Sequence, residues 1–302
     1  MTQLNSPDKI VLFVPVGLAI RSAADRVPVR NGLHVSAEHA TNTRRKFNLM
    51  PTPSGFWTAH QLPGTSAELA DDPFRWVAEA RPYKFSVVDQ SRQYLPMRFQ
   101  APLPKRNALV WPGWAGVNRD RIAPLLPPGS APDFEPDYLP IFPSTSASGS
   151  SATARILAHL AVRHSATDIR PACWALVTIS FGAKVIGIGM SDSRGATMIN
   201  FAYPSMPTPT PAEAAAGRSN VRWQIRADIY STDLGNPKKP DDPPPDFSQI
   251  IAQLASSPRV AMSTTQGPQP PLGAQTLSLG EPLTLRSRNS PTEFASSLFL
   301  KP

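Results

Sequence analysis

The segment 187–195, which reads GIGMSDSRG, has the residue types of a ligand-binding loop. In dinucleotide-binding loops a Gly-x-Gly pair is followed three residues later by a third glycine, and a helix begins there. Here Asp192 occupies that third position and an extended run, 196–203, follows. A calcium loop needs several carboxylates, and this segment offers only Asp192. We therefore expect a β-hairpin, with a strand over 185–190, a turn ending at Gly195 and a returning strand.

The side chains that enzymes use for nucleophilic or metal chemistry form no motif of known spacing. The chain has no His-Glu-x-x-His pair and no Gly-x-Ser-x-Gly elbow. Its one cysteine lies in an apolar run, where a thiol is most often an inert core residue. We therefore expect no catalytic, cofactor-binding or metal site. The side chains considered for these roles are Cys173, His34, His39, His60, His159 and His164.

The composition favours strands and loops over helices. The chain has 302 residues and 36 prolines, and a proline inside a helix removes a hydrogen bond and clashes with the preceding turn. The length fits two ordinary domains with hydrophobic cores better than one large domain. A single cysteine excludes an internal disulfide and is compatible with a reducing cytoplasm.

Charge and hydropathy bear on nucleic-acid and membrane partners. The net charge is +8, but the basic residues lie singly or in short clusters such as 44–46 and 105–106. This scatter is typical of solvated faces, so we expect no nucleic-acid partner.

The apolar run 10–20 contains Pro15 and lacks a small-residue cleavage site, which favours a buried first strand. A signal peptide within 1–20 stays an open alternative. No segment has the length of a membrane span, and we expect no membrane insertion.

Alternating apolar and polar residues predict the strands. The clearest is 221–229, while 173–180 has the pattern of a strand buried on both faces. Residues 155–163 fit a strand or a helix, and we favour a strand. Residues 277–285 fit two short strands or one strand broken by a bulge. A hairpin is expected from two runs, 85–87 and 95–99, joined by 89–93.

One helix is expected, over Asp246–Ser256. Asp246 can cap its first turn, with Gln249 three residues later. The apolar residues repeat at helical spacing, and Pro258 follows the predicted end. Such a stripe is typical of a helix that covers a core.

Proline- and serine-rich segments divide the chain. Residues 122–154 have almost no periodicity and predict a linker between an N-terminal β-sandwich over 8–121 and a C-terminal one over 155–302. Two more proline-rich stretches, 204–218 and 236–246, are expected as surface loops of the second region.

Each region also contains a turn that ends in glycine, followed by a short strand that closes on an apolar residue and a proline. The first copy is 52–63 and the second is 191–204. This similarity favours two copies of one β-sandwich unit.

These blocks resemble a known family. The run 171–204 is similar to the core of carboxypeptidase-regulatory-like, or transthyretin-like, β-sandwich domains. The order of GFWTAHQLPG (55–64), YKFSVVDQSRQYLPMRFQAPLP (83–104) and PACWALV (171–177), followed by the Asp-x-x-Gly turn, resembles proteins of extracellular contractile injection systems. These systems are phage-tail-like particles. The resemblance covers roughly 30–300.

The resemblance implies an all-β fold of two transthyretin-like or Ig-like antiparallel β-sandwich domains, the second with a short inserted helix. It implies a non-enzymatic structural or adaptor role, with other particle subunits (cap, sheath, tube or baseplate) as partners. Docking would use sandwich faces, edge strands and proline-rich arms. The protein would be cytoplasmic during assembly and then part of a released or injected particle.

The alternative is a secreted or periplasmic β-sandwich module that binds a glycan or a peptide. Trp111 and Trp114, in the segment WPGWAG, would then be its contact residues. The same tryptophans also fit a packed loop between domains, which is the commoner arrangement.

Overall fold

The computed structural model describes residues 16–59, 81–103, 109–110, 112–114, 117–127, 129–131, 136–148, 152–205, 221–235, 237, 242–265, 270–290 and 292–302. Strands dominate these ranges, which confirms the expected all-β class. The only α-helix among them is α3 (Phe247–Ala252), which continues into the short 3-10 helix η4 (Gln253–Ala255). No helix in the described ranges is long and apolar enough to span a membrane.

Several expectations fall on residues outside these ranges. They concern residues 1–15, which hold about half of the apolar run 10–20, together with His60, Trp111, most of the stretch 204–218 and part of the stretch 236–246.

The first half of the chain builds an eight-stranded sheet. Its strand order is β6-β5-β2-β3-β4-β1-β7, and β8 also pairs with β1. Alternate side chains point into one core, where Phe85 of β5 stacks on Phe99 of β6 with ring centroids 4.7 Å apart. The strands are β1 (Val16–Ser22), β2 (Leu33–His39), β3 (Asn42–Pro51), β4 (Phe56–Ala59), β5 (Arg81–Asp89), β6 (Met97–Leu103), β7 (Leu109–Val110) and β8 (Leu139–Ile141).

The second half builds two larger sheets and a small hairpin. Strand β9 (Thr153–Arg163) is the centre of a five-stranded sheet. Its partners are β10 (Ile169–Pro171), β13 (Ala196–Ala202), β16 (Leu283–Leu285) and β19 (Leu298–Leu300). The four-stranded sheet, in order, is β12 (Lys184–Met190), β11 (Leu176–Phe181), β14 (Arg222–Tyr230) and β15 (Gln275–Ser278). The hairpin is β17 (Arg288–Ser290) with β18 (Glu293–Phe294).

Both larger sheets bury one face in a shared core. Ile156 of β9, Phe201 of β13, Val177 of β11 and Ile225 of β14 belong to one buried cluster. The strands predicted at 155–163 and 221–229 are therefore confirmed. The strand predicted at 173–180 is confirmed only from Leu176, because Cys173 and Trp174 lie in a turn. The run 277–285 forms two short strands, and they lie in different sheets.

The expected purely antiparallel pairing is wrong. Among the described strands, four pairs run parallel: β1 with β7 and with β8, and β9 with β16 and with β19. In each pair the two strands are far apart in the sequence, so the chain has room for the long return that a parallel pair requires. The pairing of a central strand with strands that follow much later in the sequence depends on tertiary contacts, which local periodicity does not encode.

The core continues through the segment expected to be a linker. Leu139, Ile141 and Phe142 are fully buried, and β8 pairs with β1. The 3-10 helix η2 (Arg119–Leu125) packs against β12 of the second region. Residues 119–125 and 139–142 thus belong to the folded structure, while the domain limits 8–121 and 155–302 stay a prediction.

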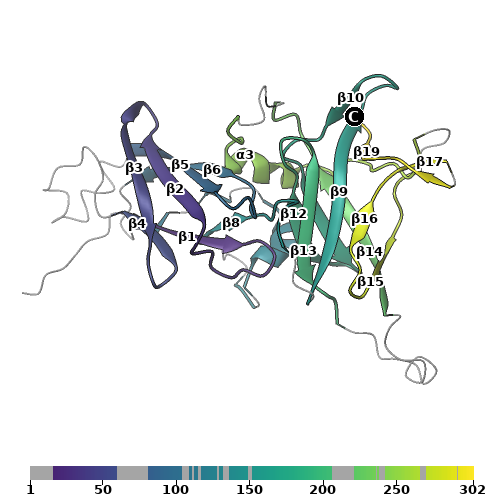
Figure 1. Cartoon of the computed structure of the whole chain (residues 1–302), viewed down its shortest axis with the longest axis horizontal. Helices are drawn as coiled ribbons and strands as arrows, with labels where there is room; N and C mark the ends of the chain where they lie inside the picture. Colours follow the sequence, from purple (N-terminus) through teal and green to yellow (C-terminus); the bar gives the residue numbers. More distant parts are fainter. Residues whose placement is uncertain are drawn as a thin grey trace, which may run out of the picture.

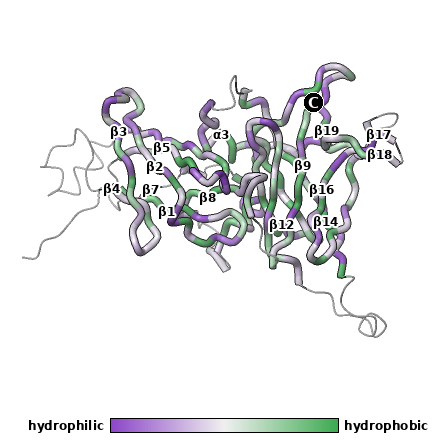
Figure 2. Tube along the Cα trace, in the orientation of Figure 1, coloured by the Kyte–Doolittle hydropathy of each residue, from purple (hydrophilic) through white to green (hydrophobic). Residues whose placement is uncertain are grey.

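Helix α3 also joins the two halves. Asp246 caps it as predicted, since its Oδ1 accepts the backbone N–H of Ser248 at 2.9 Å. Phe247 and Ile250 are buried in the core cluster of the first sheet, although they follow the second region's strands in sequence. Figure 1 shows α3 between the two groups of strands. Figure 2 shows the hydrophilic end of the β2–β3 hairpin, far from this junction.

The turn of the β5–β6 hairpin is organised by Asp89. Its Oδ1 accepts the backbone N–H of Ser91 at 2.9 Å and the Ser91 hydroxyl at 2.7 Å. Its Oδ2 accepts the backbone N–H groups of Gln93 at 2.7 Å and Tyr94 at 2.9 Å. Burial raises the pKa of this carboxyl, but the hydrogen bonds together outweigh burial and hold the pKa below its ordinary value of 3.8.

Replacing Asp89 by asparagine is expected to cost about 2 kcal/mol of unfolding free energy near pH 7, because an amide nitrogen cannot accept the second pair of hydrogen bonds. The lowered folded pKa means that ionised Asp89 stabilises the fold above the unfolded pKa. This contribution is lost as the pH falls through the folded pKa. Urea unfolding near pH 7 and at a pH below the folded pKa of Asp89 measures both protonation states. If D89N lowered the free energy of unfolding by the same amount at both pH values, this account would be contradicted.

Candidate docking surfaces

Close packing accounts for the Gly-x-Gly pair of the segment 187–195. A Cβ atom on Gly189 would lie 2.5 Å from Cγ1 of Ile199, and one on Gly187 would lie 2.8 Å from Cδ1 of Phe201. Real Cβ atoms do not come this close to other atoms, so a side chain at either position would push β12 away from β13. The glycines allow the two sheets to meet at this corner.

The turn after these glycines has the predicted chemistry but joins different strands. Oδ1 of Asp192 accepts the backbone N–H groups of Arg194 at 2.8 Å and Ala196 at 2.9 Å, and Gly195 has φ +82°. However, β12 pairs with β11 and β13 pairs with β9, in separate sheets. The predicted hairpin is therefore wrong in its pairing, because the chain crosses from one sheet to the other at Ser191–Ala196.

Cys173 lies beside this corner. It is 7% exposed, and its Sγ donates to the backbone carbonyl of Ser193 at 3.1 Å. Burial, and then the nearby negative charge of Asp192, raise the pKa of the thiol. These are the features of a structural cysteine, since a reactive one needs a lowered pKa and access to solvent.

The histidines are spread over the structure. Nδ1 of His159 lies 2.9 Å from Oγ of Ser297, and Nδ1 of His39 lies 3.2 Å from Oγ1 of Thr41. His34 is exposed on β2, and His164 follows β9. Within the described ranges, no three His, Cys, Asp or Glu side chains are grouped so that they could hold a metal ion.

Trp114 is a packing residue. It is buried, its Nε1 donates to the backbone carbonyl of Pro136 at 2.9 Å, and its ring meets Phe247 edge-on at 5.4 Å. The ring therefore has no free face on which a sugar could stack. The glycan-contact interpretation is wrong for Trp114, and the packed-loop alternative describes it.

Polar contacts fasten α3 to both halves. Arg121 of η2 donates to the backbone carbonyls of Leu254 and Ser256, and its guanidinium lies 4.8 Å from the centre of the Tyr230 ring. The buried amide of Gln253 donates to the carbonyl of Trp174 at 2.8 Å and accepts the N–H of Thr232 at 2.8 Å. These bonds fix the position of the segment that follows the second proline-rich stretch.

Trp174 has an unusual backbone. Its φ is +59°, a left-handed conformation that a bulky residue rarely adopts. Such strain persists only where the surroundings enforce it, and here the Gln253 amide and the burial of the ring do so. The strained residue stands at the edge of a cleft.

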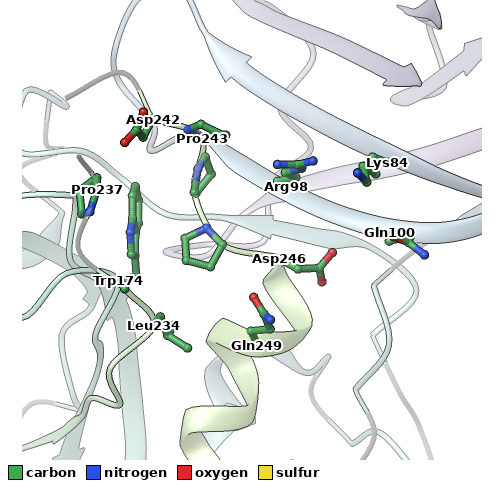
Figure 3. Close-up of a pocket in the computed structure, with 13 residues that line it drawn as sticks. Lys84, Arg98, Gln100, Trp174, Leu234, Pro237, Asp242, Pro243, Asp246 and Gln249 are labelled. Atoms are coloured by element: carbon green, nitrogen blue, oxygen red, sulfur yellow. The ribbon is translucent and has the colours of Figure 1, made fainter. Parts of the chain in front are cut away.

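This cleft, of about 520 Å³, lies between the β5–β6 hairpin and residues 234, 235, 237, 242–246 and 249. Figure 3 shows Lys84, Arg98 and Gln100 on the hairpin side, opposite the proline-rich turn and the first turn of α3. The facing wall holds Trp174, Leu234, Pro243, Pro244, Pro245, Asp242 and Asp246. One wall is therefore cationic, and the other combines apolar groups with two carboxylates.

The cationic wall is one end of a row of polar residues across the first sheet. In register across four strands, Asn48 lies opposite Ser36, Ser36 opposite Ser86, and Ser86 opposite Arg98. Asn48 lines a second hollow, of about 350 Å³, at the β2–β3 end of this row. Of the two serines, Ser36 is buried and Ser86 is half-buried. Sequence reasoning did not identify this surface, although its residues are the polar positions of strands with alternating patterns.

Comparison of the chain with protein-family models, with curated proteins and with solved structures gave no match. The resemblance to proteins of contractile injection systems therefore depends on the sequence blocks quoted above.

Proposed function

We propose that the chain is a non-enzymatic structural or adaptor component of a contractile injection system. The observation that carries this proposal is the row of polar residues across the first sheet, which runs between two hollows and ends at the cleft beside β6. A broad face with an edge strand suits contact with a neighbouring subunit, since edge strands and grooves are common sites of protein docking.

In this proposal the two halves are transthyretin-like β-sandwich domains with limits near 8–121 and 155–302. Enzymes with a cysteine nucleophile often expose its thiol, and glycan-binding modules often expose tryptophan rings. In this chain the thiol of Cys173 and the ring of Trp114 are buried, which supports a structural role. The protein would assemble into the particle in the cytoplasm and leave the cell with it.

The test is incorporation into particles. Particles sedimented from lysates of the native host are probed with an antibody against the chain, before and after a salt wash. The chain should sediment with tail-like particles and remain after the wash. A chain that stays in the supernatant would contradict the proposal and favour a secreted module that binds peptides.

A further inference from the structure

We propose that the hollow between β2 and β3 binds an extended segment of a partner protein, which pairs with the backbone of Leu33 and places a carboxylate on Arg30. This inference rests on the proposed docking function and names the chemistry of the partner. The hollow, of about 350 Å³, is lined by residues 30–35 and 48–51 and by Trp57, all within the continuous described range 16–59.

The first sheet opens at this hollow. Strand β3 pairs with β2 as far as Leu49 and then, from Met50, pairs with β4. Leu33, the first residue of β2, therefore has a paired neighbour on the β5 side only. Continued pairing would bring Pro51 opposite Leu33, and a proline has no N–H to donate. The hollow occupies the opening between the two strands.

The opening presents backbone groups that an added strand can bond. In an antiparallel sheet, the N–H and C=O groups of alternate residues point to the same neighbouring strand. The carbonyl of Gly32 accepts the N–H of Gln90 on the β5 side, so Leu33 directs its N–H and C=O toward the opening. After β3, the N–H of Thr52 donates to the first residue of β4, so the carbonyl of Pro51 also points into the opening. An extended peptide would find one donor and two acceptors there.

The charge of the lining is positive. Arg30 and His34 are exposed, and the lining contains no aspartate or glutamate. No ion pair within the described ranges involves Arg30. Asp89 lies beside Gly32, but it is buried and both of its carboxylate oxygens accept hydrogen bonds from its own turn. A ligand at the hollow therefore meets a cation whose charge no carboxylate of the lining balances.

The position of Arg30 is set by its neighbours. A Cβ atom on Gly55 would lie 3.3 Å from Nε and 3.4 Å from Nη2 of Arg30, so the guanidinium rests against the backbone just before β4. The preceding residue, Val29, is held because its carbonyl accepts Nε1 of Trp57 at 3.1 Å. Three residues of chain span at most about 11 Å, so a carboxylate near the residue that pairs with Leu33 can reach Arg30.

These features select a peptide over a phosphate or a nucleic acid. The carbonyls of Leu33 and Pro51 need hydrogen-bond donors, which a peptide backbone has and an ionised phosphate lacks. The hollow is also lined by the buried side chains of Val35 and Trp57, against which an apolar side chain can pack. Met50, with 65% of its surface exposed, stands at the rim and can cover a bound chain. The expected ligand alternates apolar and polar residues, with an acidic residue at a polar position.

The test measures binding of labelled peptides to the purified full-length chain by fluorescence anisotropy. The probe is a fluorescein-labelled peptide in which valine alternates with threonine and one central threonine is replaced by glutamate. One comparison peptide carries lysine in place of glutamate. A second is N-methylated at its backbone amides, so that it cannot donate to Leu33 or Pro51. Either change should weaken binding by at least about tenfold.

The R30E variant should weaken binding of the glutamate peptide by at least about tenfold and should bind the lysine peptide more tightly than the glutamate peptide. The matched control is R44E, which reverses an exposed cation near the turn of the same β2–β3 hairpin. It should leave the affinity within about twofold. Unchanged thermal unfolding of both variants excludes misfolding.

Hydrogen exchange of the Leu33 amide, followed by NMR, measures the backbone pairing directly. Saturation with the glutamate peptide should slow this exchange by at least about tenfold, because a hydrogen-bonded amide exchanges only after the bond opens. The amide of His34, which faces Val88 of β5, is the control and should change by less than about twofold.

Five results would overturn the inference: no binding of the glutamate peptide, equal binding of either comparison peptide, equal loss in R30E and R44E, unchanged exchange at Leu33 with the peptide bound, or displacement of the peptide by an oligonucleotide that binds more tightly. The peptide assay uses no particles, so a chain that incorporates into particles but fails this assay overturns only the inference about the hollow. A chain that binds the peptide through Arg30 but stays out of particles overturns only the proposed function.

Discussion

Replacing Gly195 by alanine is expected to lower the free energy of unfolding by about 3 kcal/mol, the larger part from steric overlap. The residue has φ +82°, and a Cβ atom would lie 2.3 Å from the backbone carbonyl oxygen of Leu160. That carbonyl accepts the N–H of Ala172 at 2.9 Å, and the N–H of Leu160 donates to the carbonyl of Gly195 at 2.8 Å. The backbone of β9 therefore cannot move aside without losing these bonds.

Gly280 provides the matched control. Its φ of +78° is similar, but nothing lies within 4 Å of the position that a Cβ atom would occupy. The G280A variant should lose only the cost of the left-handed conformation, about 1 kcal/mol. Equilibrium unfolding in urea compares both variants with the parent. Equal losses would show that contact with β9 does not constrain Gly195.

Replacing Phe247 by alanine is expected to cost about 4 kcal/mol, as truncation of a buried phenylalanine commonly does. The side chain is fully buried, and its ring packs on Trp114. Because Phe247 belongs to the core of the first sheet but follows β14 in sequence, the loss should destabilise both halves together. Unfolding monitored by circular dichroism and by tryptophan fluorescence should shift as one transition.

The control for this experiment is Phe294, on β18, whose side chain is 56% exposed. Its ring lies 5.0 Å from the guanidinium of Arg288, so its removal should cost less than about 1 kcal/mol. If F247A lost no more unfolding free energy than F294A, the packing of Phe247 would not hold α3 against the first sheet.

Local patterns predicted the elements that are long and half-buried. The alternation over 221–229 and over the 85–99 hairpin identifies β14, β5 and β6, because each strand buries one face. The cap of α3 was predictable as well, since Asp246 satisfies a backbone donor that every helix start leaves free.

The missed features depend on contacts between distant segments. Strand β8 has three residues, one of them Pro140, so it is too short to display a period. It forms because Leu139 and Ile141 are buried beside β1. Similarly, the turn at Asp192 has the local sequence of a hairpin, but Gly187 and Gly189 allow the two strands to pack face to face in different sheets.

The cleft could not be predicted for the same reason. Lys84 and Arg98 were identifiable as outward positions of a hairpin, but scattered cations of this kind are common on protein surfaces. They line a cleft only because the fold brings a facing wall of prolines and Trp174 from the second half of the chain.

The central claim is that this chain docks onto other subunits of a phage-tail-like particle. The most direct measurement is purification of the tagged chain from its native host, with the co-purifying proteins identified by mass spectrometry and the eluate viewed by negative-stain electron microscopy. We expect sheath, tube, cap or baseplate proteins together with tail-like particles. A clean monomer without such partners would contradict the claim.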